Sequence, residues 1–145
     1  AGGTALPVVH LIVGTRALEA GEVERAVMHL ELALKANPNM PMVLNNLAWG
    51  LAHRELPDLD RALRLIDAAI PLSDHPHLHG TRALILAELG RPREAIHELE
   101  GVLRRHPDPA WVHERLADLY RRAGVEDLAE LHAQLAAYFR KPPDK

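Results

Sequence analysis

Residues 19–38 read EAGEVERAVMHLELALKANP, and the same order of residue types returns twice further along the chain. The later copies are ELGRPREAIHELEGVLRRHP at 88–107 and RAGVEDLAELHAQLAAYFRKP at 122–142. Each has a glycine, an acidic residue, an alanine and then an apolar helical stretch that ends near a proline. A fourth stretch, PDLDRALRLIDAAIPLSD at 57–74, fits the pattern without the glycine. The chain therefore contains an internal repeat, and a repeat decides the architecture before any other feature.

The alanines that align give the period of this repeat. They are Ala26, Ala62, Ala95 and Ala129, and their spacings are 36, 33 and 34 residues (62 − 26, 95 − 62 and 129 − 95). A period near 34 residues is typical of arrays built from one supersecondary unit, in which each unit covers the apolar face of its neighbour.

A second helical pattern precedes each of these stretches. The four patterns are PVVHLIVGTRALEA, PMVLNNLAWGLAHR, PHLHGTRALILAEL and AWVHERLADLYRRA, which start at residues 7, 41, 76 and 110. Apolar residues recur in them at steps of three and four, which predicts an apolar stripe along a helix. Three of the four begin with proline, which suits the first helical turn. Gly21, Gly90 and Gly124 fall between paired helices, where glycine can take a positive φ. We predict an all-α chain of eight helices in four antiparallel pairs.

The pattern resembles the tetratricopeptide repeat, W-x2-L-G-x2-Y…A-x3-F…P. The matching residues are Val13, Gly14, Ala26, Leu30 and Pro38 in the first repeat, Leu44, Leu47, Ala48, Leu51, Ala62 and Ile66 in the second, Ala83, Leu86, Ala95, Leu99 and Pro107 in the third, and Leu116, Ala117, Tyr120 and Ala129 in the fourth. The resemblance implies an α-solenoid, a right-handed superhelix of helix pairs. It predicts a single domain over 7–141, with repeats at about 7–40, 41–75, 76–109 and 110–141, a disordered N-terminus at 1–6 and a tail at 142–145.

The sequence departs from this family pattern in three places. The second repeat lacks the turn glycine and carries two extra residues in ELPDLDR, so a longer loop is expected there, with Asp58 and Asp60 capping the helix that follows. The third repeat has Arg82 where an apolar residue is usual. The fourth has Ala133 at a large apolar position, and its last helix is expected to act as the cap of the array.

The composition limits the class of function. Apolar residues make up 48% of the chain and aromatic residues 3%, a mixture rich in leucine and alanine that favours helices. A formal net charge of −3 argues against a nucleic-acid or anionic-membrane binder. The chain has no cysteine, which excludes disulfides and thiolate chemistry, and no apolar run approaches the ~20 residues of a membrane span. The compartment stays open: cytoplasm is favoured, and the periplasm or a membrane-tethered longer chain is left as an alternative.

In the family, the first helix of each pair lines a concave surface. Carried over by position, the resemblance implies a peptide- or partner-binding set of Leu11, Thr15, Asn45, Asn46, Trp49, His77, Leu84, Trp111 and Asp118. An asparagine amide can both donate to and accept from an extended peptide backbone, and Asn46 matches the position of the family's backbone-gripping asparagine. The alternative for the asparagines is simple solvation. The alternative for Trp49 and Trp111 is packing between repeats.

The first repeat is apolar where the family's chaperone-type carboxylate clamp needs lysine and asparagine. Leu11 and Thr15 stand at those positions, and only Asn46 matches the set, so capture of a C-terminal carboxylate is unsupported. An apolar start suits a partner helix, an apolar peptide or another copy of the protein, because exposed apolar patches usually mark contact surfaces.

The histidine-rich stretch SDHPHLHG at 73–80 is the one sequence that suggests a metal site. In a helix, residues two apart point about 200° apart, so His77 and His79 would diverge. His79 also shares its repeat position with His10 and His113, where a residue packs within the helix pair. We therefore expect no metal site, and no cofactor. The chain has no phosphate loop, HExxH motif or nucleophile elbow, so no enzymatic activity is expected.

These observations predict a non-enzymatic protein-interaction scaffold whose partner is a protein or peptide, with no nucleic acid and no membrane insertion. Two alternatives stay open. One is a structural module that joins copies into an oligomer through the apolar first repeat or the terminal helix. The other is the docking domain of a larger enzyme or of a secretion or assembly component.

Overall fold

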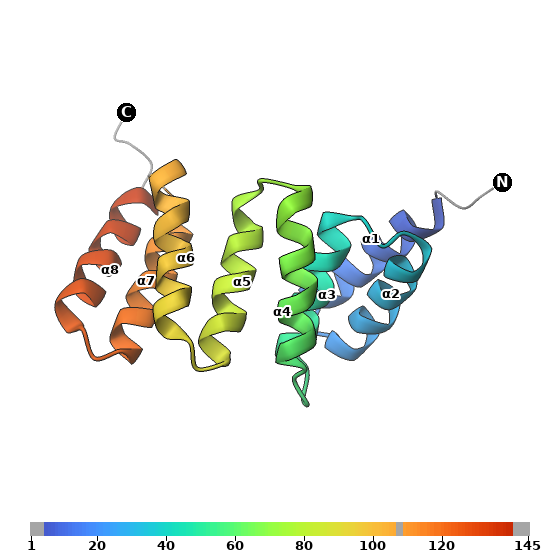
Figure 1. Ribbon diagram of the computed structural model, residues 1–145, viewed down its shortest axis with the longest axis horizontal. Helices are drawn as coiled ribbons and strands as arrows, with labels where there is room; N and C mark the ends of the chain where they lie inside the picture. The colour runs from blue at the N-terminus through green and yellow to red at the C-terminus, as the bar shows by residue number, and fades with distance from the viewer. Residues whose placement is uncertain (1–4, 107–108, 141–145) are drawn as a thin grey trace. The chain divides into compact units, whose positions relative to one another are not determined.

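The structure, a computed structural model, describes residues 5–106 and 109–140 (Figure 1). Its elements are α1 (Ala5–Glu19), α2 (Val23–Ala36), α3 (Pro41–His53), α4 (Leu59–Ala69), the short 3-10 helix η1 (Ile70–Leu72), α5 (Pro76–Glu88), α6 (Pro92–Arg105), α7 (Ala110–Arg122) and α8 (Glu126–Arg140). In the described residues there are helices and no strands, which confirms the predicted all-α architecture of helix pairs. α1 begins at Ala5, inside the segment expected to be disordered, and residues 1–4 and the tail lie outside the described ranges.

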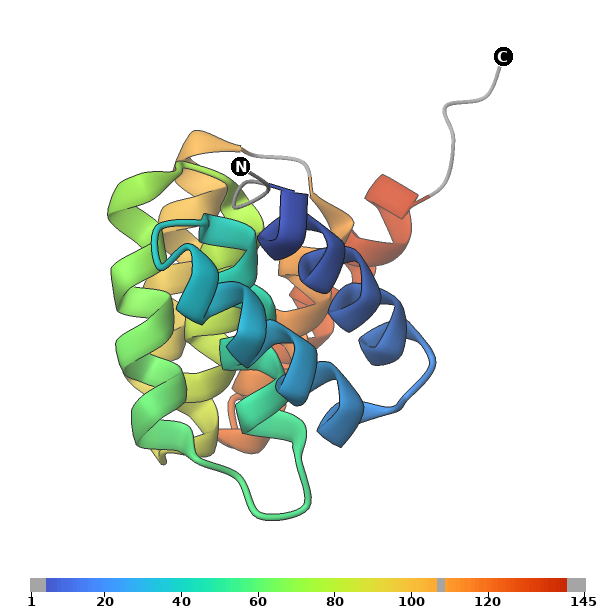
Figure 2. The same cartoon turned by 90° about the vertical axis from the view of Figure 1, so that its right-hand side faces the viewer.

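The chain divides into two compact units, Ala1–Ile85 and Leu86–Lys145, with the boundary inside α5. In the first unit α1 packs against α2, α3 packs against α4, and α3 also contacts both α2 and α1. Figure 2 shows α1 and α2, in blue, side by side in front of α3. In the second unit α7 packs against α8 and against α6. The predicted boundaries of a single domain over 7–141 stay a prediction.

The turn between paired helices is built in the same way around three glycines. Gly21, Gly90 and Gly124 all have φ of 77°, a left-handed conformation that costs glycine nothing. At the first of them, Gly21 N donates to Leu18 O at 3.0 Å and Glu22 N to Ala17 O at 2.8 Å. This pair of hydrogen bonds satisfies the last carbonyls of the helix, so the sequence positions of these glycines determine where α1, α5 and α7 end.

The second repeat closes its turn without a glycine. Across the longer loop, Asp58 N donates to Leu51 O at 3.0 Å. The Asp58 carboxylate then accepts from Arg61 N at 3.1 Å and caps α4. The predicted capping role of Asp58 is confirmed, and one aspartate therefore joins the end of α3 to the start of α4.

Small residues allow the two helices of a pair to approach closely. The repeat alanines Ala26, Ala62, Ala95 and Ala129 are between 0% and 1% exposed, which confirms the register read from the sequence. In the first pair, a Cβ added to Gly14 would lie 2.8 Å from Leu30 Cγ and 3.4 Å from Ala26 O. Because real Cβ atoms do not come that near a neighbour, α1 and α2 depend on glycine at this point.

Two histidine pairs join paired helices in the first and last repeats. His10 Nδ1 lies 3.0 Å from His29 Nδ1, and His113 Nδ1 lies 2.9 Å from His132 Nδ1. In both cases the residues are 19 apart in sequence. The expectation that His10 and His113 pack within their helix pairs is met. Two facing Nδ1 atoms share one hydrogen, so one ring of each pair is the Nδ1–H tautomer and the other accepts through Nδ1.

The pair in the last repeat is enclosed by aromatic rings. His113 is buried, its ring lies 5.4 Å from that of Phe139, and its Nε2 is buried without a hydrogen-bond partner among the described residues. We assign the shared hydrogen to His113 Nδ1, because a bare buried lone pair at Nε2 is tolerated better than an unpaired N–H. Burial, and then the charge that His113 would carry, lower the pKa of His132, while Glu100 on α6 opposes the shift.

We expect the close packing at Gly14 to dominate the effect of adding a methyl group there. Gly14→Ala should lower the free energy of unfolding by about 1 kcal/mol, because overpacking outweighs the gain in helix propensity. Gly101→Ala, also inside a helix, is the matched control. Its added Cβ would meet only Arg104 Nη2 at 3.4 Å, so it should stabilise by about 0.5–1 kcal/mol. Urea unfolding measures both, and equal effects would contradict the close-approach argument.

We expect the His113–His132 pair to make stability depend on pH. The pKa of His132 is lower in the folded chain than in the unfolded chain, so its contribution is complete above about pH 6.5 and is lost as the pH falls. His132→Asn, which keeps an acceptor near the Nδ1 position but does not titrate, should reduce the fall in melting temperature between about pH 7.5 and 5.5. His97→Asn, at an exposed site on α6, should leave that slope unchanged. Identical slopes for His132→Asn and the wild type would refute the role of the pair.

Candidate protein-interaction surface

The predicted site residues of α1 and α3 are joined by a short hydrogen-bond network. Asn45 Nδ2 donates to Asn46 Oδ1 at 3.0 Å, and Asn46 Nδ2 donates to Thr15 Oγ1 at 2.9 Å. Asn45 is 9% exposed and its Oδ1 is buried without a partner among the described residues, so this side chain belongs to the interior. Asn46 and Thr15 are half-buried. The network therefore separates the two neighbouring asparagines: Asn45 is interior and bonds to Asn46, whereas Asn46 joins α3 to α1 and still reaches the surface.

Trp49 lies one turn along α3 from this network. Its indole is half-buried and stacks on the exposed His53 ring, with the ring centres 3.7 Å apart and the planes 17° apart. The Nδ1 of His53 lies 2.8 Å from Trp49 O. In the Nδ1–H tautomer it donates a hydrogen bond to this carbonyl, which holds the imidazole over the indole. One face of the tryptophan is thus covered by its own helix. Whether the remainder meets a partner stays a prediction.

Apolar side chains surround the network on the solvent side. On α1, Val8 and Ile12 are 44% and 48% exposed, and on α3 Met42 is 46% exposed. Leu11 is half-buried. Residues three and four apart share a face of a helix, and the Thr15–Asn46 hydrogen bond places the two faces next to each other. We call this surface the α1–α3 face; it consists of Val8, Leu11, Ile12, Thr15, Met42, Asn46 and Trp49.

The predicted site residues of α5 have mixed surroundings. His77 is exposed and Leu84 is half-buried, while the neighbouring Thr81 is buried and donates to His77 O at 3.2 Å. Arg82, the unusual residue of this helix, donates through Nε to Asp67 on α4 at 2.7 Å. An ion pair between helices therefore explains the arginine, and Asp67 is a partner that the sequence alone did not indicate.

The stretch 73–80 is a junction between repeats. Ser73 Oγ accepts from His75 N at 3.3 Å, Pro76 begins α5, and the His75 and His77 rings lie 5.2 Å apart. His79 is half-buried on the next turn. Within residues 5–106 and 109–140, no group of three or more histidine, aspartate or glutamate side chains gathers closely enough to hold a metal ion.

In the second unit the predicted residues lie on α7. Trp111 is half-buried. The exposed Asp118 forms an ion pair with Arg122 at 3.1 Å, and Arg122 also lies 3.6 Å from Glu88. On the same helix, Tyr120 donates to Glu100 on α6 at 2.8 Å. Burial and that hydrogen bond raise the pKa of Tyr120 to about 12, so the phenol remains protonated and links α7 to α6.

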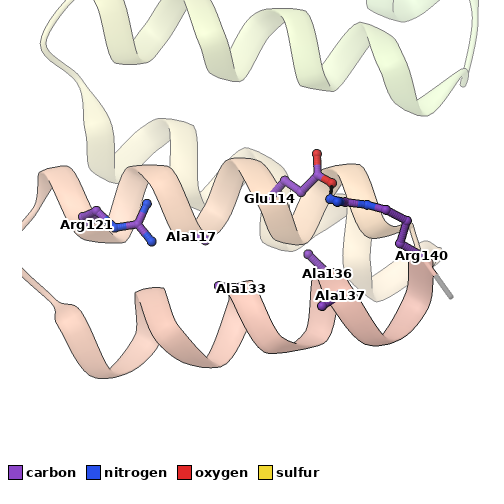
Figure 3. A pocket seen from close by; sticks show the side chains of 7 residues that line it. All are labelled: Glu114, Ala117, Arg121, Ala133, Ala136, Ala137 and Arg140. Carbon is purple, nitrogen blue, oxygen red and sulfur yellow. Dashed lines mark ion pairs between the residues drawn. The ribbon is translucent and has the colours of Figure 1, made fainter.

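A cleft of about 250 Å³ opens between α7 and α8 (Figure 3). Arg140 and Glu114 form an ion pair at one end of it, and Arg121 lies toward the other end. Its lining is Glu114, Ala117, Arg121, Ala133, Ala136, Ala137 and Arg140. The cleft was not predicted from the sequence, although Ala133, an alanine at a large apolar position of the repeat, was the available signal. The common spacing of 19 residues was likewise the available signal for both histidine pairs.

No helix in the described part of the chain combines the length and the apolar character that crossing a bilayer requires.

Comparison with known proteins places this arrangement among helical repeat proteins. A curated relative, the TPR repeat-containing thioredoxin TTL4 of Arabidopsis thaliana, is 43% identical over 72 residues, which cover 49% of this chain and 11% of the relative. This chain thus matches only a small part of that protein's length.

Solved structures show the same fold. MamA MSR-1 aligns with a TM-score of 0.70 at 23% identity, over 91% of this chain and 75% of that one. The APC/C hetero-tetramer Cut9–Hcn1 aligns with a TM-score of 0.82 at 18% identity, over 95% of this chain and 28% of that one. The tetratricopeptide repeat family model matches residues 7–141. Because that match spans nearly the whole chain, the protein belongs to the tetratricopeptide repeat family.

Proposed function

We propose that the protein is a non-enzymatic scaffold that binds a peptide or partner helix on the α1–α3 face. Membership of the repeat family and the structural likeness to MamA and to the APC/C subunits support the coarser part of this function, a protein-interaction scaffold. The finer part, the binding surface, is supported by the chemistry of the face itself.

The observation that carries the proposal is the unused hydrogen-bonding capacity of Asn46. Its Oδ1 accepts from Asn45 and its Nδ2 donates to Thr15, so one lone pair and one hydrogen remain on a half-buried amide. The two internal bonds hold the amide plane in one orientation. An oriented amide can pair with the N–H and C=O of one backbone residue of a partner at a low entropic cost.

Apolar contact would supply most of the affinity. Val8, Ile12 and Met42 are each exposed by more than two fifths, and Trp49 offers the uncovered part of its indole beside them. Burial of apolar area drives association, and buried aromatic residues are common hot spots. An apolar surface with one oriented amide fits a segment that presents an apolar side chain next to an accessible backbone group.

A peptide display selection tests this surface. Peptides of about 12 residues selected on the wild-type protein should bind Asn46→Ala and Trp49→Ala with dissociation constants about tenfold higher or more, which corresponds to ~1.4 kcal/mol. Arg64→Ala, which changes an exposed side chain on α4, serves as the control and should bind as the wild type does. Melting curves confirm that each variant is folded. If the selected peptides bind Asn46→Ala and Trp49→Ala unchanged, the α1–α3 face is not the binding site.

A further inference from the structure

The contact between the first two repeats shows how one repeat covers the next in this chain. α3 contacts both α2 and α1. A Cβ built on Gly50 of α3 would lie 3.1 Å from Val27 Cγ2 on α2 and 3.7 Å from Leu18 Cδ2 on α1. Val43, seven residues before Gly50 and therefore on the same face of α3, is fully buried. The side of α3 that runs from Val43 to Gly50 is thus the side that faces the preceding pair.

The corresponding side of α1 lies open. In the repeat register Val9 is equivalent to Val43, and further along to Leu78 and Val112. Those three residues are 0%, 1% and 0% exposed, whereas Val9 is 50% exposed. Gly50, in turn, is equivalent to Arg16. The interior helices carry Ile85 and Leu119 at that position, both buried, and α1 carries an exposed arginine.

The α7–α8 pair carries the other half of the same contact. The cleft between α7 and α8 is equivalent to the surface that α3 covers on the first repeat, because Ala117 corresponds to Gly14 and Ala133 to Leu30. Ala133 replaces a leucine, so the cleft has room for larger side chains from an incoming helix (Figure 3). Val27, which meets Gly50 in the interior seam, corresponds to the exposed Glu130.

The two open halves carry opposite charges at the positions that meet. In the first seam Gly50 meets Val27. The residues at the equivalent positions further along the chain are Ile85 and Leu63, then Leu119 and Ile96, and all four are apolar. Among these eight repeat positions only two residues are charged, the arginine of α1 and the glutamate of α8. If these residues served only to keep the two surfaces hydrated, charges of either sign would do. The opposite signs add a complementary pair to two surfaces that already match in register.

We propose that α1 of one copy docks in the α7–α8 cleft of a second copy, as α3 docks on α1 and α2, with Arg16 of one copy against Glu130 of the other. Val9 enters the cleft between the alanines. Glu130 accepts from Gln134 through Oε1, which orients the carboxylate on the outer side of α8. Arg121 takes the place of Leu18 at the rim and adds one like charge near Arg16, so the contact is weakened at that point.

The proposed contact is heterologous, because α1 and the cleft are different surfaces. Each pair of joined copies keeps one free α1 and one free cleft, and association continues past the dimer until a ring closes. A symmetric contact between two apolar first repeats would instead stop at the dimer. The proposal concerns a surface other than the α1–α3 face, so it stands or falls separately from the proposed peptide binding.

Sedimentation velocity on the full chain, from about 1 μM to about 500 μM, tests the proposal by charge reversal. We expect the wild-type mass to rise with concentration beyond that of a dimer. Arg16→Glu and Glu130→Arg should each raise the dissociation constant about tenfold, because an attractive pair becomes a repulsive one. An equimolar mixture of the two variants should associate again. In the mixture the carboxylate introduced on α1 of one variant meets the guanidinium introduced on α8 of the other, and the unchanged Arg16 meets the unchanged Glu130.

The mixture keeps the experiment informative even if one variant is destabilised, because a folding defect is not repaired by mixing. Arg121→Ala should strengthen association by removing the like charge, and Arg64→Glu on α4 should have no effect. Asn46→Ala and Trp49→Ala should leave self-association unchanged, which separates this contact from peptide binding. A wild-type protein that stays monomeric throughout, a limit at the dimer, or single variants that do not associate again on mixing would each overturn the proposal.

Discussion

The close approach of paired helices, seen for α1 with α2, α3 with α4 and α7 with α8, is the constraint on which the rest of the structure depends. Every second helix contributes an alanine that is at most 1% exposed, and in the first pair Gly14 lies against Leu30 and the backbone of Ala26. Helices that approach this closely bury one stripe each and leave a second apolar side uncovered. A pair of this kind is stable only when a neighbouring pair covers that side, so the array form follows from the packing of a single repeat.

The same packing decides which polar residues are structural and which remain available. Asn45 and Asn46 are adjacent in sequence and identical in type, yet Asn45 is buried and bonds only to Asn46 in the hydrogen bonds described, whereas Asn46 joins α3 to α1 and keeps hydrogen-bonding capacity at the surface. The ten histidines are divided in a similar way. Those at positions 10, 29, 113 and 132 pair between helices, whereas His53 covers the Trp49 indole. Residue type did not distinguish these roles, because each depends on which side chain lies opposite.

Three departures from the repeat pattern are explained by the residues that lie next to them in the structure. Arg82 replaces an apolar residue and pairs with Asp67 on the adjacent helix. The second repeat has no turn glycine, and Asp58 performs two tasks in its longer loop, closing it through its backbone N–H and capping α4 through its carboxylate. Ala133 replaces a large residue and leaves the cleft between α7 and α8. Each departure from the repeat pattern thus marked a position with a local role, and the neighbouring residues in the structure identified that role.

The sequence by itself determined the helix pairs, their register and their turns. These features depend on local periodicity, on glycine at positive φ and on alanines repeated at a common spacing, all of which are properties of short segments. It also indicated which helix faces carry Leu11, Thr15, Asn46 and Trp49. Only the tertiary structure decided that Asn45 is interior, that four histidines form two pairs, and that a cleft opens between α7 and α8. Those outcomes depend on which side chains face one another between two helices. The facing histidines are 19 residues apart in sequence, and spacing along the chain does not fix how the helices pack.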